Sequence, residues 1–88
     1  MKRTLTVGTM GTVPPRATPH PYLRKVGSRI CQLREAKGWN QERFAAEAGV
    51  DRSYAHGLES GRRNVTVLKL RQIAKALGVR SADLLGDD

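Results

Sequence analysis

The chain has 88 residues, with 16 Lys or Arg against 8 Asp or Glu and a formal charge of +8, which limits it to one small domain. No apolar run approaches the roughly 18 residues of a membrane span. Residues 4–13 hold too few apolar side chains for a secretory signal, and one cysteine with two distant histidines excludes a disulfide scaffold or a zinc site. We therefore expect a soluble, cytoplasmic protein that needs no metal or cofactor and makes no membrane contact, and whose charge favours an anionic partner.

The start of the chain is predicted to be a flexible basic arm. Residues 1–25 contain five Lys or Arg and no acid, and all four prolines fall within residues 14–21. With few apolar groups to bury, such a segment is expected to stay extended and flexible. The predicted organisation is an arm over residues 1–21 and one folded domain over residues 22–88.

Five helices and no strand are predicted after the arm, so the expected fold class is all-α. Apolar residues recur at three- and four-residue steps over about 22–37, and Gly38 ends this first helix. Three further helices follow residues with good capping side chains: 41–48 after Asn40, 52–59 after Asp51, and 67–77 after Thr66. A last short helix begins at Ser81.

The helices 41–48 and 52–59 are joined by about three residues around Gly49, so they must cross steeply as a helix-turn-helix. Ala55 and Leu58 face the core, which at roughly 100° per residue turns the opposite side of this helix outward. That side carries Arg52, Ser53, His56, Gly57 and Ser60, with Tyr54 at its margin. Hydrogen-bond donors on a helix fit the major groove of B-DNA, so we expect this helix to read DNA.

From Leu23 to Leu85 the chain resembles the helix-turn-helix domain of phage repressors, Cro and the xenobiotic-response-element regulators. The matching segments are Arg-Ile-Cys-Gln-Leu-Arg at 29–34, Lys-Gly-Trp-Asn-Gln at 37–41, Ala-Gly-Val at 48–50, Leu-Glu-Ser-Gly-Arg-Arg-Asn at 58–64 and Ala-Lys-Ala-Leu-Gly-Val at 74–79. Residues 51–59 and the Arg-Arg-Asn-Val-Thr that follows them at 62–66 are most similar to controller proteins of restriction–modification systems. The resemblance implies a five-helix, lambda-repressor-like fold and a regulator that binds a palindromic operator in double-stranded DNA as a homodimer.

The resemblance also implies which residues touch DNA. It places phosphate contacts on Asn40 and Gln41, where the N-terminus of a helix adds partial positive charge. Base contacts fall on Arg52 and Ser53 beside Tyr54 and His56, and backbone or minor-groove contacts on the loop that follows. The full candidate set is Asn40, Gln41, Arg43, Arg52, Ser53, Tyr54, His56, Arg62, Arg63 and Asn64.

Other side chains are expected to have structural roles. In the family, the residues corresponding to Arg34 and Glu59 form an internal salt bridge. Cys31 is expected to be a small packing or surface residue, with a redox sensor as the weaker alternative. Trp39 is expected to cover the core and His20 to be inert. Val79, Leu84 and Leu85 exceed the core needs of so small a domain, so they are expected to line a homodimer interface through the C-terminal helices.

Two other classes of function remain as alternatives to the transcriptional regulator. An antitoxin-like interaction module could use the basic arm to bind an acidic protein. An enzyme is the weaker alternative, because no acid orients His56 next to Ser53 and the sequence indicates no pocket. For a regulator, RNA polymerase is a further candidate partner.

Overall fold

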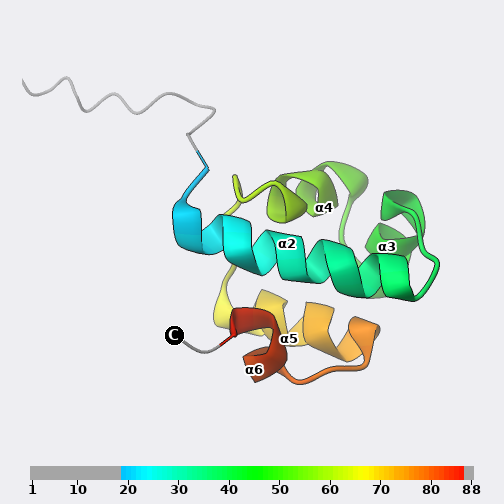
Figure 1. Ribbon diagram of the computed structural model, residues 1–88. Helices are drawn as coiled ribbons and strands as arrows, with labels where there is room; N and C mark the ends of the chain where they lie inside the picture. The colour runs from blue at the N-terminus through cyan, green and yellow to red at the C-terminus, as the bar shows by residue number, and fades with distance from the viewer. Residues whose placement is uncertain (1–18, 87–88) are drawn as a thin grey trace, which may run out of the picture.

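The computed structural model describes residues 19–86, which form five α-helices and no strand. The helices are α2 (Pro21–Ala36), α3 (Gln41–Ala48), α4 (Arg52–Glu59), α5 (Val67–Leu77) and α6 (Ser81–Leu85). In Figure 1, α2 lies across the middle of the molecule, with α3 and α4 above it and α5 and α6 below it. The all-α prediction is therefore confirmed. The predicted arm lies outside the described residues except for its last three, and Pro21 already belongs to α2.

The helix ends follow the local sequence. The side chains of Asn40, Asp51 and Thr66 each accept a hydrogen bond from the backbone N–H three residues on, at 2.7, 2.7 and 3.1 Å. Gly49 ends α3 in the left-handed region at φ 73°, which glycine adopts without the penalty of a Cβ atom. These contacts involve near neighbours only, and α3, α4 and α5 begin and end at the predicted residues.

One apolar core joins all five helices. Each helix contributes at least one side chain that is almost completely buried: Val26, Ile30, Phe44, Ala45, Ala48, Ala55, Leu58, Leu70, Ile73, Ala74, Leu77 and Leu84. Ala45 and Ala48 of α3 and Ala55 of α4 belong to this core, and α3 packs against α4. A domain of this size buries a modest fraction of its surface, so each of these contacts matters for stability.

The prediction for Leu84 at a dimer interface is wrong. Its side chain is fully buried in the core, and Val79 and Leu85 are partly buried against the same core. The Tyr22 hydroxyl donates to the backbone oxygen of Leu85 at 3.1 Å and ties α6 to α2. A count of apolar residues cannot show that α6 folds back over α2 and α5. Within residues 19–86, the large apolar side chains left exposed are instead Val67 (81%) and Leu68 (78%).

The start of α2 shows that the expectation for His20 is also wrong. Nδ1 of His20 accepts a hydrogen bond from the Tyr22 N–H at 3.1 Å and so caps the helix. The His20 N–H donates to the Gly61 oxygen at 3.3 Å. This contact places the beginning of α2 beside the loop that follows α4.

No helix in the described part of the chain is long and apolar enough to cross a bilayer.

Candidate nucleic-acid interface

The outward side of α4 is polar and exposed, as the rotation argument predicts. Ala55 and Leu58 are buried, whereas Arg52, Ser53 and His56 are exposed. Tyr54 is half-buried, which agrees with its predicted place at the margin. The orientation of the helix is thus confirmed, and contact of these side chains with DNA stays a prediction.

The C-terminal end of α4 is held closely by α2. A Cβ atom on Gly27 of α2 would clash with the backbone oxygens of Leu58 and Glu59. Any larger residue at position 27 would therefore push the two helices apart. Because α3 packs against α4 as well, the polar face is presented on a rigid support.

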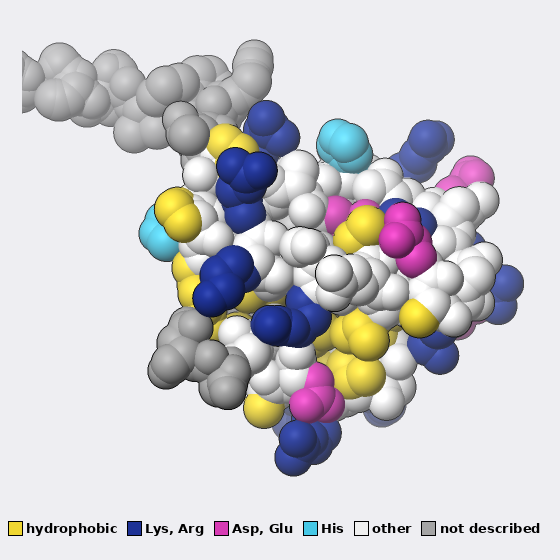
Figure 2. All heavy atoms as spheres, viewed as in Figure 1, with side chains coloured by type: hydrophobic (Ala, Val, Ile, Leu, Met, Phe, Trp, Pro, Cys, Tyr) yellow, Lys and Arg dark blue, Asp and Glu magenta, His cyan; other side chains and the backbone are white. Residues whose placement is uncertain are grey.

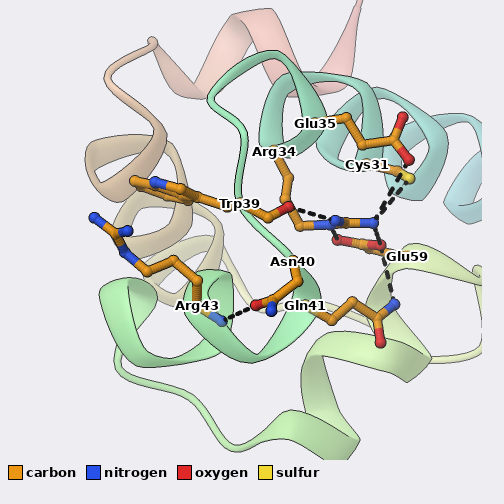
Figure 3. A network of polar contacts seen from close by, with 8 residues as sticks. All are labelled: Cys31, Arg34, Glu35, Trp39, Asn40, Gln41, Arg43 and Glu59. Carbon is orange, nitrogen blue, oxygen red and sulfur yellow. Dashed lines mark hydrogen bonds and ion pairs between the residues drawn. The ribbon is translucent and has the colours of Figure 1, made fainter.

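A polar network behind this face links α2, α3 and α4 (Figure 3). Nε and Nη2 of Arg34 donate to the two carboxylate oxygens of Glu59 at 2.7 and 3.2 Å, and Nη1 donates to the Trp39 oxygen at 2.7 Å. The hydrogen bond to Glu59, opposed by burial, raises the pKa of Arg34 above its ordinary value. The salt bridge implied by the resemblance is therefore confirmed, and it fixes the end of α4 to α2.

The two predicted phosphate contacts at the start of α3 have partners within the protein. Asn40 uses its side-chain oxygen to cap the helix, and the Gln41 amide donates to Glu59 at 3.1 Å. The network therefore holds the N-terminus of α3 against the end of α4. A DNA phosphate at this N-terminus would meet backbone N–H groups that lack partners inside the helix.

Two cations lie over the ring of Trp39, next to the same helix end. The Lys37 ammonium is 5.0 Å and the Arg43 guanidinium 5.3 Å from the centre of the indole ring. The ring packs partly buried against the core, as expected for a covering residue. Arg43 also pairs with Glu47 at 3.0 Å on the surface of α3.

Gly57 has a role that the sequence argument missed. A Cβ atom there would lie 2.7 Å from Cγ of Arg63, so the missing side chain makes room for that arginine. The Arg63 guanidinium is 5.5 Å from the centre of the Tyr54 ring. Burial, opposed by the charge of Arg63, raises the pKa of Tyr54. Arg63 thus lies along α4, beside the helix face predicted to read bases, while Arg62 and Asn64 are exposed in the loop.

Cys31 is half-buried on α2. Its sulfur accepts a hydrogen bond from Arg34 at 3.4 Å, and burial raises its pKa, which disfavours the reactive thiolate. Among residues 19–86 no group of three or more His, Cys, Asp or Glu could hold a metal ion.

Comparisons with known proteins agree with this geometry. A family described as helix-turn-helix matches residues 31–84. An uncharacterised HTH-type transcriptional regulator of Sinorhizobium fredii is 45% identical over 60 residues, which span 68% of this chain and 78% of the relative. The crystal structure of the restriction-modification controller protein C.AhdI from Aeromonas hydrophila is 42% identical, with a TM-score of 0.71 over 74% of this chain and 98% of that chain. The structure of SinR, a master regulator for biofilm formation, in complex with DNA is 32% identical, with a TM-score of 0.66 over 69% of this chain and 98% of that chain. The chain belongs to the helix-turn-helix family.

Proposed function

We propose that this protein is a sequence-specific transcriptional regulator that inserts α4 into the major groove of double-stranded DNA. The observation that carries the proposal is the two-sided character of α4. Ala55 and Leu58 fix one side in the core, and Arg52, Ser53 and His56 project from the other. An arginine so placed can donate two hydrogen bonds to a guanine edge, which no other base pair offers in the same pattern.

The surroundings of α4 support phosphate contacts on both sides of the groove. The N-terminus of α3, with Asn40 and Gln41, offers backbone donors, and the loop after α4 offers Arg62 and Arg63. Contacts of this kind fix the register of a protein on DNA without reading its sequence. The related regulators and the controller protein, together with a relative solved in complex with DNA, support a non-enzymatic, DNA-binding function.

The proposed active form is a homodimer through the C-terminal helices, with residues other than those first expected. Val67 and Leu68, at the start of α5, expose large apolar side chains that a second copy would cover. A twofold dimer would place two α4 helices on half-sites roughly 34–36 Å apart and would require a palindromic operator. Sedimentation of Leu68→Glu tests this surface: the wild type is expected to be a dimer and the variant a monomer, and a dimer that survives the substitution contradicts it.

Selection of bound sequences from a random DNA pool at defined salt tests the function itself. The expected result is one enriched motif with twofold symmetry. A pool that gains no motif, although the protein binds DNA in low salt, would mean that the contacts are to phosphates alone. The protein would then not be a sequence-specific regulator.

Three narrower proposals concern the type of regulator, its location in the cell and its protein partner. The similarity to C.AhdI favours a restriction–modification controller that acts in the cytoplasm, with RNA polymerase as a further partner. Transcription in vitro from a promoter that carries the selected operator tests this partner. Output that changes with added protein supports it, and output that stays constant while the operator is occupied contradicts it.

A further inference from the structure

A basic groove that the proposed DNA contacts do not use runs across α2. Five residues of α2 line a hollow of about 380 Å³, which we name the α2 groove: Arg24, Lys25, Ser28, Arg29 and Gln32. A second hollow of about 740 Å³ shares Arg24, Ser28 and Gln32 with it and extends to Arg62. Figure 2 shows the resulting row of Lys and Arg side chains crossing the helix. Arg24, Lys25 and Arg29 thus bring three cations of one helix to the α2 groove.

Arg29 gives the groove an unsatisfied donor. Its Nη1 atom is the one buried side-chain nitrogen or oxygen without a hydrogen-bond partner among the described residues. The guanidinium lies against Gly86, where an added Cβ atom would clash with Nη1. A buried donor without an acceptor is unfavourable, so a ligand oxygen that reached Nη1 would relieve this cost. Arginine also forms paired hydrogen bonds with carboxylates, which gives such a ligand a defined orientation.

Among the described residues that line the α2 groove, every charged side chain is a cation. No Asp or Glu occurs before position 35 in the whole chain. The two acids that border the second hollow are Glu35 and Glu59, and Glu59 already pairs with Arg34. A concave surface lined by one sign of charge concentrates the field and attracts ligands of the opposite sign. The groove therefore suits an anionic ligand.

The direction of the groove decides which anion fits. At one end, Arg24 fills the space beside Gly61 in the loop after α4, and at the other end Arg29 packs against Gly86 after α6. The groove therefore leads from the α4 side of α2 to its α6 side. None of the five residues that line the α2 groove is among the residues proposed to contact DNA, so we expect the groove to stay accessible when operator DNA is bound.

We propose that the α2 groove binds an Asp- and Glu-rich segment of a partner protein while α4 holds DNA. Carboxylates of the segment would pair with Arg29 and with the cations beside it, and Ser28 and Gln32 would add neutral hydrogen bonds. Simultaneous binding of DNA rests on the proposed function. Binding of the acidic segment by itself does not.

Fluorescence anisotropy of a short labelled Asp/Glu-rich peptide tests the groove, first with the free protein and then with its operator complex. The variant Lys25→Gln with Arg29→Gln is compared with a matched control, Arg71→Gln with Lys75→Gln, which removes the same charge from exposed positions of α5. Loss of the groove cations is expected to weaken peptide binding about tenfold, the size of one charge-assisted contact, and the control to change it less than about twofold. Operator affinity is expected to stay unchanged in both variants.

Because Arg29 packs against Gly86, Arg29→Lys with thermal melting is a second measurement. This variant keeps the charge but not the paired donors, so peptide affinity should fall while the melting curve shows a folded protein. Equal losses in the groove and control variants would mean nonspecific attraction and overturn the proposal. Displacement of operator DNA by the peptide would also overturn the proposal. So would a groove variant that loses affinity only for duplexes with long sequences on either side of the operator. In both cases the groove would hold DNA rather than an acidic segment. If the groove behaves as expected and no operator exists, the proposed function fails and the groove stands.

Discussion

Replacing Arg34 by methionine tests how much the buried pair behind α4 contributes to stability. The change removes two hydrogen bonds to Glu59, one to the Trp39 oxygen and one to the Cys31 sulfur. The Glu59 carboxylate, whose side chain is 6% exposed, then keeps the Gln41 amide as its remaining side-chain donor. Water cannot reach this carboxylate well enough to replace the lost guanidinium.

The size of the expected loss in stability follows from the burial of the Arg34–Glu59 pair. Removing one partner of a buried ion pair costs about 3–5 kcal/mol, because the other charge stays buried. A domain of this size has a total stability near the low end of about 5–15 kcal/mol, so Arg34→Met should approach the limit of folding at room temperature. The exposed pair Arg43–Glu47 supplies the control. It joins the same types of groups at 3.0 Å with side chains 59% and 44% exposed, and Arg43→Met should cost at most about 1 kcal/mol.

Urea unfolding in the cold, followed by circular dichroism, measures the free energy of unfolding of the wild type, of Arg34→Met, Glu59→Met and Arg43→Met, and of the double variant. The double variant Arg34→Met with Glu59→Met should be more stable than Arg34→Met alone, because no unpaired charge remains buried. If Arg34→Met and Arg43→Met lose the same stability, burial does not determine how much an ion pair contributes to the free energy of unfolding. If the two substitutions at 34 and 59 are additive, the side chains do not interact energetically and the reasoning is refuted.

Three further predictions follow from the site, the last helix and the cysteine. Arg52→Ala should lose about 1–3 kcal/mol of binding preference at one base pair per half-site. Arg63→Ala should weaken binding to all DNA sequences and lower the slope of log affinity against log salt concentration by about 1. Affinities across an operator series at several salt concentrations check both, and a uniform loss from Arg52→Ala contradicts base reading. The backbone and side-chain hydrogen bonds from Arg80 lower the pKa of Asp83 below its ordinary 3.8, so its contribution to stability is present above that pH and is lost as the pH falls through the lowered pKa. Wild type and Asp83→Asn should therefore differ in unfolding free energy at neutral pH and converge in acid. Because burial raises the pKa of Cys31 from 9.0, iodoacetamide should modify it more slowly than a free thiol at neutral pH, with a rate that rises above pH 9.0. Mass spectrometry measures this rate, and rapid modification at neutral pH would contradict the raised pKa.

Local sequence determined the helices of this protein and the orientation of the proposed reading face. The caps at Asn40, Asp51 and Thr66 are contacts over three residues, and the apolar periodicity of α4 depends on its own eight positions. Such features need no knowledge of the rest of the chain, because each one is decided within a helical turn. The Arg34–Glu59 pair was found through the family resemblance, since residues 25 apart are not brought together by local geometry.

Tertiary structure alone decided which side chains are covered. Leu84 is buried because α6 folds back over α2 and α5. Position 57 has no room for a side chain because Arg63 lies across it. Contact of His20 with Gly61 and of Arg29 with Gly86 likewise joins segments far apart in the sequence. Periodicity reports which face of a helix is apolar, but packing decides which neighbour meets that face. The sequence therefore determined the helices and the proposed reading face of α4, whereas the core contacts, the exposed pair Val67 and Leu68, and the α2 groove followed from the packing of the five helices.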